Sequence, residues 1–298
     1  MSSKLAAVLI ASPSAPAVDA SLLADAAAAL PQCSLRVLRE GVAAEIILPA
    51  GEPEAVRSAL AAAIAGRPVD LAVLPAEGRR KRLLIADMDS TFIEQECIDE
   101  LAEAFGLAAE IAPITQRAMR GEIAFEPALR ERAALFRGRA PGAAVAQILR
   151  ERVTFTPGGR TAIATLRAAG VYAALVSGGF TSFTAPVAAH LGFDENRGNV
   201  LETEDGRLTG LLREPVLGSE AKVTALDDLL GRRGLTRADA VAIGDGANDI
   251  PMLKAAGLGV AFRAKPAVAA VADVRIDHGD LTALLYLQGY AADEIRDA

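Results

Sequence analysis

Four aspartates stand where their carboxylates can act together. Asp87 and Asp89 come directly after an apolar run, and side chains at that spacing point to the same side of a strand. Asp245 and Asp249 follow a later apolar run, on a turn rich in glycine. Like charges about 4 Å apart repel by roughly 4 kcal/mol at an effective dielectric constant near 20. A shared pocket therefore needs a cation. Because the ligands are all oxygen, the sequence favours a hard divalent ion, Mg²⁺.

An anion site is expected beside these carboxylates. The segment Ser177-Gly178-Gly179 follows another apolar run and offers a hydroxyl and unhindered backbone N–H groups. Lys222 lies near the start of the helix that precedes the strand of Asp245. A cation site and a phosphate site side by side indicate phosphoryl transfer, with a carboxylate able to act as the covalent nucleophile.

Other functional interpretations of the same residues have less support from the sequence. A calcium-binding EF-hand loop starting at Asp87 would need an acid, a glycine and a glutamate at its fifth, sixth and twelfth positions. Those positions hold Thr91, Phe92 and Ile98. The residues around Ser177 do not form the G-x-S-x-G turn of serine hydrolases. Of the two histidines, His190 is expected at a helix C-terminus and His278 in a surface loop.

Residues 79–298 alternate apolar strands with helices, which predicts an α/β domain built on a parallel sheet. The expected strands are Leu83–Ile85, Tyr172–Val176, Val241–Ile243 and Leu258–Ala261, with helices such as Gly159–Ala169 and Glu220–Leu230. In open parallel sheets, ligands bind beyond the carboxyl ends of the strands, where the polar segments fall. Two insertions can cover that site as caps: a helical one at about 93–152 and a β-hairpin at about 199–214, turning at Asp205-Gly206.

Residues 1–78 form a separate domain with the predicted order βαββαβ. Its expected elements are Leu5–Ala11, Ala20–Leu30, Ser34–Leu38, Ala43–Leu48, Glu52–Ala65 and Val69–Leu74. That order is typical of a ferredoxin-like sandwich of helices on an antiparallel sheet. The segment contains no Gly-rich phosphate loop, which favours a structural or regulatory role.

Composition limits the classes of function. The chain has 298 residues, 52% hydrophobic and 23% charged, which fits two globular domains. Its net charge of -7 argues against a nucleic-acid or anionic-membrane binder. The basic run Gly78–Arg82 is therefore expected to be a solvated linker. Cys33 and Cys97 can form one disulfide at most, and Cys97 is expected to be a buried apolar residue.

The N-terminus and the hydropathy pattern indicate a cytoplasmic protein. Lys4, the short apolar run Leu5–Ala11 and the small residues Ala15-Pro16-Ala17 resemble a weak secretory signal. The run is at the short end for a signal, and the neighbouring segments need it as a strand. No apolar stretch of about 18 residues free of charge or proline is found.

The polar segments together resemble the four motifs of the haloacid dehalogenase superfamily of phosphatases. The motif segments are Asp87-Met88-Asp89-Ser90-Thr91, Ser177-Gly178-Gly179, Lys222 and Gly244-Asp245-Gly246-Ala247-Asn248-Asp249. The resemblance covers about residues 80–295 and implies a Rossmann-like core with a helical cap. Within the superfamily, the cap is similar to that of the phosphoserine phosphatase family. The cap segments concerned are Glu94–Glu100, Thr115–Met119, Phe125-Glu126 and Leu129–Arg132.

The resemblance implies a role for each motif residue. Asp87 would attack phosphorus and Asp89 would act as general acid and base. Mg²⁺ would be held by the carboxylates of Asp87 and Asp245 and by the backbone carbonyl of Asp89. The residues implied to bind the phosphoryl group are Ser177, Gly178 and Lys222, and those implied to support the site from outside are Asp249 and Thr91.

The resemblance also implies the substrate, O-phospho-L-serine, and thus the last step of serine biosynthesis. Glu96 would bind its ammonium and Arg132 its carboxylate, while Asn248 would contact the phosphate or substrate. Met119 and Phe125 would form the apolar wall, with Gly179 allowing close approach. The N-terminal domain resembles, in its element order alone, the ACT-like extension of some members, and such domains pair in homodimers.

Two alternatives stay open at this point. The same core can act on another small phosphomonoester, or transfer phosphate to a second acceptor. From a different class, the chain can be a ligand sensor without turnover, although every position that the chemistry requires is present.

Overall fold

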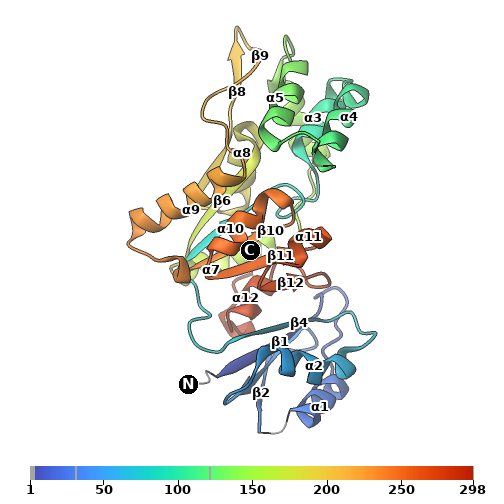
Figure 1. The fold of residues 1–298 in the computed structure, drawn as a ribbon, viewed down its shortest axis with the longest axis vertical. Helices are drawn as coiled ribbons and strands as arrows, with labels where there is room; N and C mark the ends of the chain where they lie inside the picture. Colours follow the sequence, from blue (N-terminus) through green and yellow to red (C-terminus); the bar gives the residue numbers. More distant parts are fainter. Residues whose placement is uncertain (1–3, 31, 121, 298) are drawn as a thin grey trace.

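The computed structural model describes residues 4–30, 32–120 and 122–297. The chain forms three parts along its long axis: an N-terminal domain, a central core and a cap at the end opposite the N-terminus (Figure 1).

The N-terminal domain is a four-stranded antiparallel sheet with two helices. Its elements are β1 (Leu5–Ile10), α1 (Ala20–Ala29), β2 (Ser34–Arg39), β3 (Ala43–Leu48), α2 (Pro53–Ile64) and β4 (Asp70–Pro75). The strand order is β2-β3-β1-β4, and every pairing is antiparallel. The predicted order of strands and helices is the observed one. Helix α1 begins after Asp19, whose side chain accepts the Leu22 N–H and so satisfies one free donor of the first turn.

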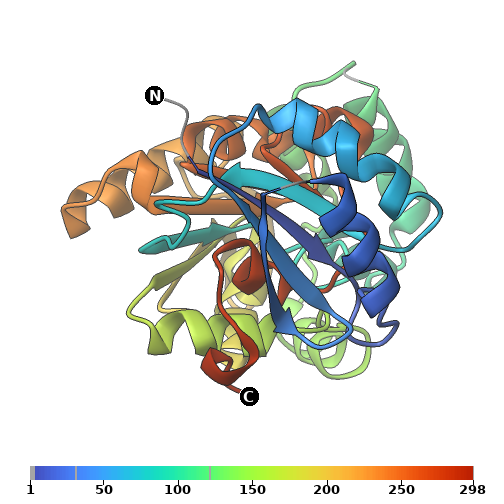
Figure 2. The same cartoon turned by 90° about the horizontal axis from the view of Figure 1, so that it is seen from below.

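Both faces of this sheet are buried at β1 and β3, whereas the edge strand β2 is mostly exposed. In β1, Leu5, Ala7 and Leu9 pack among the residues of α1 and α2. Alternate residues of the same strand, such as Val8 and Ile10, belong to the hydrophobic cluster of the core domain instead. All six β1 residues are buried for this reason. The view from below shows the sheet lying between its two helices and the core (Figure 2).

Polar contacts fix the N-terminal domain to the core. The Asp70 carboxylate, at the start of β4, accepts the backbone N–H groups of three consecutive core residues, Asp277, His278 and Gly279. His278 itself is exposed, as predicted.

The basic run before the core is exposed at Gly78, Arg80 and Arg82, as expected for a solvated linker, but Arg79 is largely buried. Arg79 Nη2 lies 2.6 Å from the carboxylate of the buried Glu45, on β3. Arg80 pairs with Glu294 and lies over the ring of Tyr290, 4.1 Å from its centroid. Arg79 and Arg80 lie at the junction between the domains, where they pair with the carboxylates of Glu45 and Glu294.

The core is a six-stranded parallel sheet. Its strands are β5 (Leu83–Ala86), β6 (Tyr172–Phe180), β7 (Glu195–Asn199), β10 (Ala240–Gly244), β11 (Leu258–Phe262) and β12 (Val274–Ile276). The order is β12-β11-β10-β5-β6-β7, so the chain turns from one side of β5 to the other. The four predicted strands are confirmed. The sequence did not predict β12, and it assigned part of β7 to the hairpin insertion, because neither carries an apolar run of ordinary length.

Helices cover both faces of this sheet. They are α7 (Gly159–Ala168), α8 (Thr181–Leu191), α9 (Ser219–Arg233), α10 (Ile250–Ala255), α11 (Pro266–Ala269) and α12 (Ala283–Leu287). Residues of α9 and α10 pack against one set of alternate strand residues, including Leu83 and Ile85. Residues of α7, α8 and α12 pack against the other set, including Leu84 and Ala86. Helix α12 also contacts β1, which joins the two domains.

The cap consists of four helices and a hairpin. The helical insertion forms α3 (Cys97–Ala104), α4 (Ala108–Met119), α5 (Phe125–Leu135) and α6 (Pro141–Glu151). The predicted hairpin is present as β8 (Leu201–Glu204) and β9 (Arg207–Leu212), and β9 packs on α5. The helical insertion leaves the core after Ile93 and returns to it before Phe155, and these two residues form an isolated antiparallel bridge. Among the described residues, every helix is too short or too polar to cross a membrane.

Candidate active site

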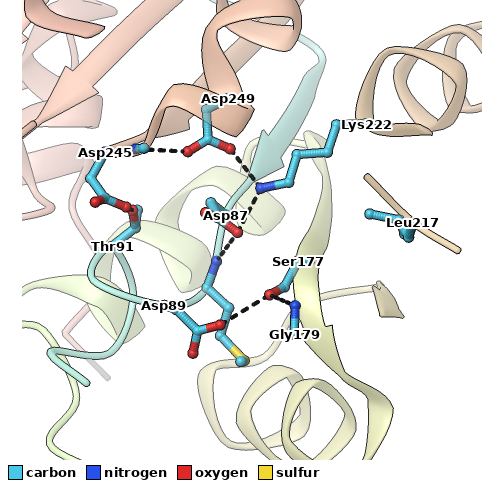
Figure 3. A network of polar contacts seen from close by, with 12 residues as sticks. Asp87, Asp89, Thr91, Ser177, Gly179, Leu217, Lys222, Asp245 and Asp249 are labelled. Carbon is cyan, nitrogen blue, oxygen red and sulfur yellow. Dashed lines mark hydrogen bonds and ion pairs between the residues drawn. The ribbon is translucent and has the colours of Figure 1, made fainter. Parts of the chain in front are cut away.

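The predicted site residues meet at the carboxyl ends of three adjacent strands. Asp87 and Asp89 follow β5, Ser177 lies near the end of β6, and Asp245 follows β10. Since β5 lies between β6 and β10, its two aspartates lie at the centre of the group (Figure 3). This is the place where the strand order reverses, and where parallel sheets bind ligands.

A buried lysine joins two of the aspartates. Lys222, in the first turn of α9, has no exposed surface. Its Nζ lies 2.8 Å from Asp87 Oδ1 and 2.6 Å from Asp249 Oδ1. Asp249 Oδ2 accepts the Gly246 N–H at 3.0 Å, which fixes the carboxylate on its turn. Lys222 therefore lies inside the site and not on the surface of its helix.

The two oxygens of Asp87 have different surroundings. Oδ1 accepts the Met88 N–H and pairs with Lys222, whereas Oδ2 has no hydrogen-bond partner among the residues that the structure describes. One oxygen of Asp87 is therefore held and the other is left for a reaction partner.

Burial and charge set the protonation of this cluster. Burial, and next the charge of Asp249, raises the pKa of Asp87 well above its ordinary value. Burial alone would lower the pKa of Lys222, but the charges of Asp249 and Asp87 outweigh it and raise that pKa. Lys222 is therefore an ammonium ion at neutral pH, as an anion site requires.

Asp89 is held as a candidate acid. Its Oδ1 accepts the Cys97 N–H at 3.1 Å, and its Oδ2 lies 3.3 Å from Ser177 Oγ. Burial, and then the charge of Glu96, raises the pKa of Asp89 to about 7. A carboxyl with this pKa gives up and takes back a proton near neutral pH. Cys97 is buried, as predicted, and burial raises the pKa of its thiol, so it is not a thiolate.

The acidic residues fit a divalent cation. Carboxylate oxygens of Asp87, Asp245 and Asp249 lie within 4.8 Å of one another, and all three residues are buried. Thr91 Oγ1 donates to Asp245 Oδ1 at 3.3 Å. Burial, and then the charge of Asp249, raises the pKa of Asp245 to about 6. One lysine among three close carboxylates leaves negative charge in excess, and the donor set is all oxygen, which a hard cation prefers.

Two glycines allow the side chains of Phe125 and Asp89 to approach the backbone closely above the sheet. A Cβ on Gly178 would lie 2.7 Å from Phe125 Cζ, at the start of α5 in the cap. A Cβ on Gly179 would lie 2.8 Å from Asp89 Oδ2. The Gly179 N–H donates to Ser177 Oγ at 2.8 Å. The hydroxyl and this N–H therefore lie together beside Asp89, as the sequence predicted.

The cavity above these groups also contains charges from the cap. It measures about 420 Å³, and Asp87, Asp89, Ser177 and Asp245 are among its lining residues from the core. The cap residues that line it are Glu96, Ile98, Thr115, Ala118, Phe125, Leu129 and Arg132. Asn248 and Ser219 line it as well. The side chain of Met119, predicted to lie in the apolar wall, is outside the described part of the structure.

Arg132 is a buried cation with no anionic partner among the residues described. Its Nε donates to the Ala128 carbonyl at 3.2 Å, and its Nη1 lies 3.5 Å from Thr115 Oγ1. Burial lowers its pKa, which the charges of Asp99 and Glu96 partly offset. Arg132 therefore does not lie on an exposed face of its helix. A buried guanidinium that faces a cavity without a carboxylate of its own fits an anionic ligand.

Glu96 lies at the N-terminus of α3 and is exposed to the cavity. Its Oε1 accepts the Ser90 hydroxyl at 2.8 Å. Ser90 has a φ of 52°, a left-handed conformation that is uncommon for residues other than glycine. The sequence analysis did not predict that Ser90 would hold the Glu96 carboxylate. Its position between Asp89 and Thr91 was the only signal that could have found it.

Comparison with known proteins agrees with this geometry. Residues 84–254 match the haloacid dehalogenase-like hydrolase family, and this chain belongs to that family. Two curated relatives are more specific. The chain is 46% identical over 211 residues to the phosphoserine phosphatase of Albidiferax ferrireducens, which covers 69% of the chain and 89% of the relative. It is 42% identical over 258 residues to that of Streptomyces coelicolor, covering 86% of the chain and 62% of the relative.

A solved structure extends the likeness to the N-terminal part. The unliganded probable phosphoserine phosphatase of Vibrio cholerae is 31% identical, with a TM-score of 0.78. The match covers 97% of this chain and 88% of that one. Within its family, the chain therefore groups with the phosphoserine phosphatases. It spans about three-fifths of the length of the Streptomyces coelicolor relative.

Proposed function

We propose that this chain hydrolyses O-phospho-L-serine to L-serine and inorganic phosphate. The observation that carries the proposal is one cavity in which two kinds of group meet. The core supplies Asp87, Asp89 and Ser177, which suit phosphoryl transfer. The cap supplies an unpaired Arg132 and the carboxylate of Glu96, which suit the carboxylate and ammonium of an amino acid.

The first half-reaction breaks the ester bond. Asp87 Oδ2 attacks phosphorus while Lys222 holds Oδ1 and so fixes the carboxylate. The bond from phosphorus to the serine oxygen breaks, and Asp89 donates its proton to that oxygen. Serine leaves, and the phosphoryl group stays on Asp87 as an acyl phosphate. Lys222, the Ser177 hydroxyl and the Gly178 N–H bind its oxygens.

The second half-reaction regenerates the aspartate. Asp89, now ionised, accepts a proton from water as the water oxygen attacks phosphorus. The bond from phosphorus to Asp87 breaks and inorganic phosphate is released. Asp89 is protonated again, which the pKa of about 7 allows near neutral pH. The same side chain therefore acts as acid and then as base.

Mg²⁺ is the proposed cofactor. Asp87, Asp245 and the backbone carbonyl of Asp89 would hold it, with Asp249 and Thr91 supporting the site from outside the ligand shell. When bound, the ion offsets the charge of the clustered carboxylates and of the phosphate. The close grouping of Asp87, Asp245 and Asp249 supports this assignment.

Recognition of the amino acid part is assigned to the cap. Arg132 would bind the substrate carboxylate through a bidentate pair, and Glu96 would bind the ammonium. Phe125 and Met119 would form the apolar wall, and Asn248 would contact the phosphate. The burial of Arg132 strengthens its attraction for a carboxylate because water screens the charges less.

The N-terminal domain, residues 1–78, is proposed to be ferredoxin-like and related to ACT domains. Its strand order β2-β3-β1-β4 and its two helices support this. The proposal also includes a regulatory role for this domain, a homodimer, a cytoplasmic location and a place in serine biosynthesis.

The experiment is phosphate release from O-phospho-L-serine, measured with Mg²⁺ and then with excess EDTA. Release that needs both the metal and Asp87, absent in Asp87→Asn, supports the reaction and the substrate together. Metal-dependent release from other phosphate esters alone would keep the core assignment and overturn the roles of Glu96 and Arg132. A folded chain without activity on any phosphate ester would favour a ligand sensor.

A further inference from the structure

The ladder between β6 and β7 is interrupted at the phosphate site. Val176 pairs with Arg197, and the next pair is Phe180 with Asn199. Three residues of β6, Ser177 to Gly179, therefore lie opposite the single residue Gly198 of β7. The backbone groups of these three residues must find partners outside the ladder, or stay free for a ligand.

The Asn199 side chain supplies one of those partners. Its Nδ2 donates to the Gly178 carbonyl at 2.8 Å. The same side chain pairs with the backbone of Leu217: Nδ2 donates to its carbonyl at 3.1 Å, and Oδ1 accepts its N–H at 2.7 Å. Asn199 is 2% exposed, so water does not compete for these hydrogen bonds.

We propose that Asn199 is a positioning residue that holds the two phosphate-binding segments in register. The proposal rests on the proposed function for its reaction, but the juxtaposition of Asn199 with Gly178 and Leu217 is independent of the substrate.

The hydrogen bond from Asn199 to the Gly178 carbonyl sets the direction of the Gly179 N–H. In a trans peptide the C=O and the following N–H point in opposite directions. Because Asn199 holds the Gly178 carbonyl on its own side, the Gly179 N–H points away from Asn199, toward Ser177 Oγ and Asp89. A glycine peptide without this anchor rotates freely, because no Cβ restricts it.

The hydrogen bonds between Asn199 and Leu217 fix the start of α9, the helix that carries Lys222. Leu217 lies two residues before Ser219, where α9 begins, and the Lys222 N–H donates to the Gly218 carbonyl in its first turn. Figure 3 shows Leu217 on the side of the network from which Lys222 enters. One amide side chain therefore relates the Gly179 N–H, which orients the Ser177 hydroxyl, to the start of the helix that carries Lys222. The hydroxyl and the ammonium are the two groups that must meet the same phosphoryl group.

The test compares Asn199→Ala and Asn199→Ser with Asn196→Ala. Asn196 lies on the same strand, but its side chain accepts the Thr184 hydroxyl on α8, and in the described part of the chain it makes no hydrogen bond to the phosphate segments. Each variant is measured for kcat and KM with O-phospho-L-serine and for its affinity for inorganic phosphate by calorimetry with Mg²⁺ present. The increase in Tm on adding Mg²⁺ alone is also measured.

The expected result is a loss of about tenfold to a hundredfold in kcat for both Asn199 variants. Phosphate affinity falls by a comparable factor, while the increase in Tm with Mg²⁺ keeps its size because Asp245 is not linked to Asn199. Asn196→Ala keeps kcat and phosphate affinity. Asn199→Ser serves if Asn199→Ala does not fold, since a hydroxyl keeps one polar group in the buried space.

Two results would overturn the proposal. One is phosphate affinity in a folded Asn199 variant equal to that of Asn196→Ala. The other is an equal loss of the phosphate and the Mg²⁺ responses, which would make Asn199 a general stability residue. If the unaltered chain releases no phosphate from O-phospho-L-serine, the proposed function fails, and the phosphate affinities still decide the role of Asn199.

Discussion

The ammonium of Lys222 lies 2.8 Å from Asp87 Oδ1 at a place that water does not reach. A charge with no exposed surface on its side chain is costly unless it is paired, and here it is paired with the proposed nucleophile. The lysine therefore has two tasks in this structure. It offsets carboxylate charge when no substrate is bound, and it presents a cation to the phosphoryl group when one is.

Replacing this lysine separates the two tasks. Lys222→Met keeps the length of the side chain and removes its charge, which leaves Asp87 and Asp249 without their shared cation. The free energy of unfolding of the metal-free protein should fall by about 3–5 kcal/mol, and kcat with Mg²⁺ by about a hundredfold or more. Urea unfolding and phosphate release measure these. Lys254→Met, on the exposed surface of α10, is the control, and a loss in it of similar size would contradict the argument.

The role of Arg132 is tested by the choice of substrate. Arg132→Ala should raise KM for O-phospho-L-serine by about tenfold to a hundredfold, because hydrogen bonds between charged groups contribute a free energy of that size to binding. O-phosphoethanolamine has no carboxylate, so the variant and the unaltered chain should differ little with it. Arg130→Ala is the matched control, because Arg130 is exposed on the same helix and pairs with Glu126 and Glu214. Equal losses with both substrates would show that Arg132 only supports the cap.

Stability should depend on pH in the absence of metal. Asp89 keeps its proton up to about pH 7 and Asp245 up to about pH 6 in the folded protein, against an ordinary value of 3.8. Over that range the folded state binds more protons than the unfolded one. The contribution of these groups to the free energy of unfolding therefore falls as the pH rises.

Metal should reverse this trend, because the ionised carboxylates are the form that binds it. Mg²⁺ should raise Tm by several degrees more at about pH 7.5 than at about pH 5. Thermal unfolding with Mg²⁺ or EDTA measures the difference. Asp245→Asn should lose most of the response. A response that is the same at both pH values would argue against a carboxylate site.

The contact between Gly178 and the cap makes a steric prediction. In Gly178→Ala the new Cβ would lie 2.7 Å from Phe125 Cζ, so the Phe125 ring, or the cap helix that carries it, has to shift. We expect kcat/KM to fall by about tenfold or more, with partial recovery in the double variant Gly178→Ala/Phe125→Leu. Gly231→Ala is the control, since a Cβ there meets nothing within 4 Å. Strictly additive losses in the double variant would exclude the proposed clash.

The junction between the domains is tested at Asp70. Asp70→Ala leaves three backbone N–H groups of the core, at residues 277–279, without their acceptor. The free energy of unfolding should fall by about 3 kcal/mol, measured in urea. Asp25→Ala, exposed on α1, should change it little. If the two variants unfold alike, the junction does not depend on this carboxylate.

The position of the proposed chemical residues could be predicted from the sequence because each follows an apolar strand. Asp87, Ser177 and Asp245 could be placed together from that pattern alone, since the carboxyl ends of neighbouring parallel strands meet. The pairing of Lys222 with Asp87 and Asp249 could not be predicted in this way. It depends on the packing angle of α9, which leaves no mark in the spacing of residues.

Asn199 and the arginines of the linker show why the rest was missed. The strand β7 reads ENRGN and has no apolar residue, so the polar segment around Asn199 resembles a loop. Arg79 stands in a basic run that looks solvated, yet its carboxylate partner, Glu45, is 34 positions earlier in the chain. Long-range partners of polar side chains cannot be predicted from local pattern.

The two-sided burial of β1 has a consequence for how the protein is made. Ribosomes synthesise β1 long before α12, the core helix that contacts it and lies at residues 283–287. Until then, the side chains of Ala6, Val8 and Ile10 lack their final neighbours. Domains that fold during synthesis usually do so in order from the N-terminus. This domain must wait for the core residues that cover β1, and until they are made that face of the strand presents an apolar surface.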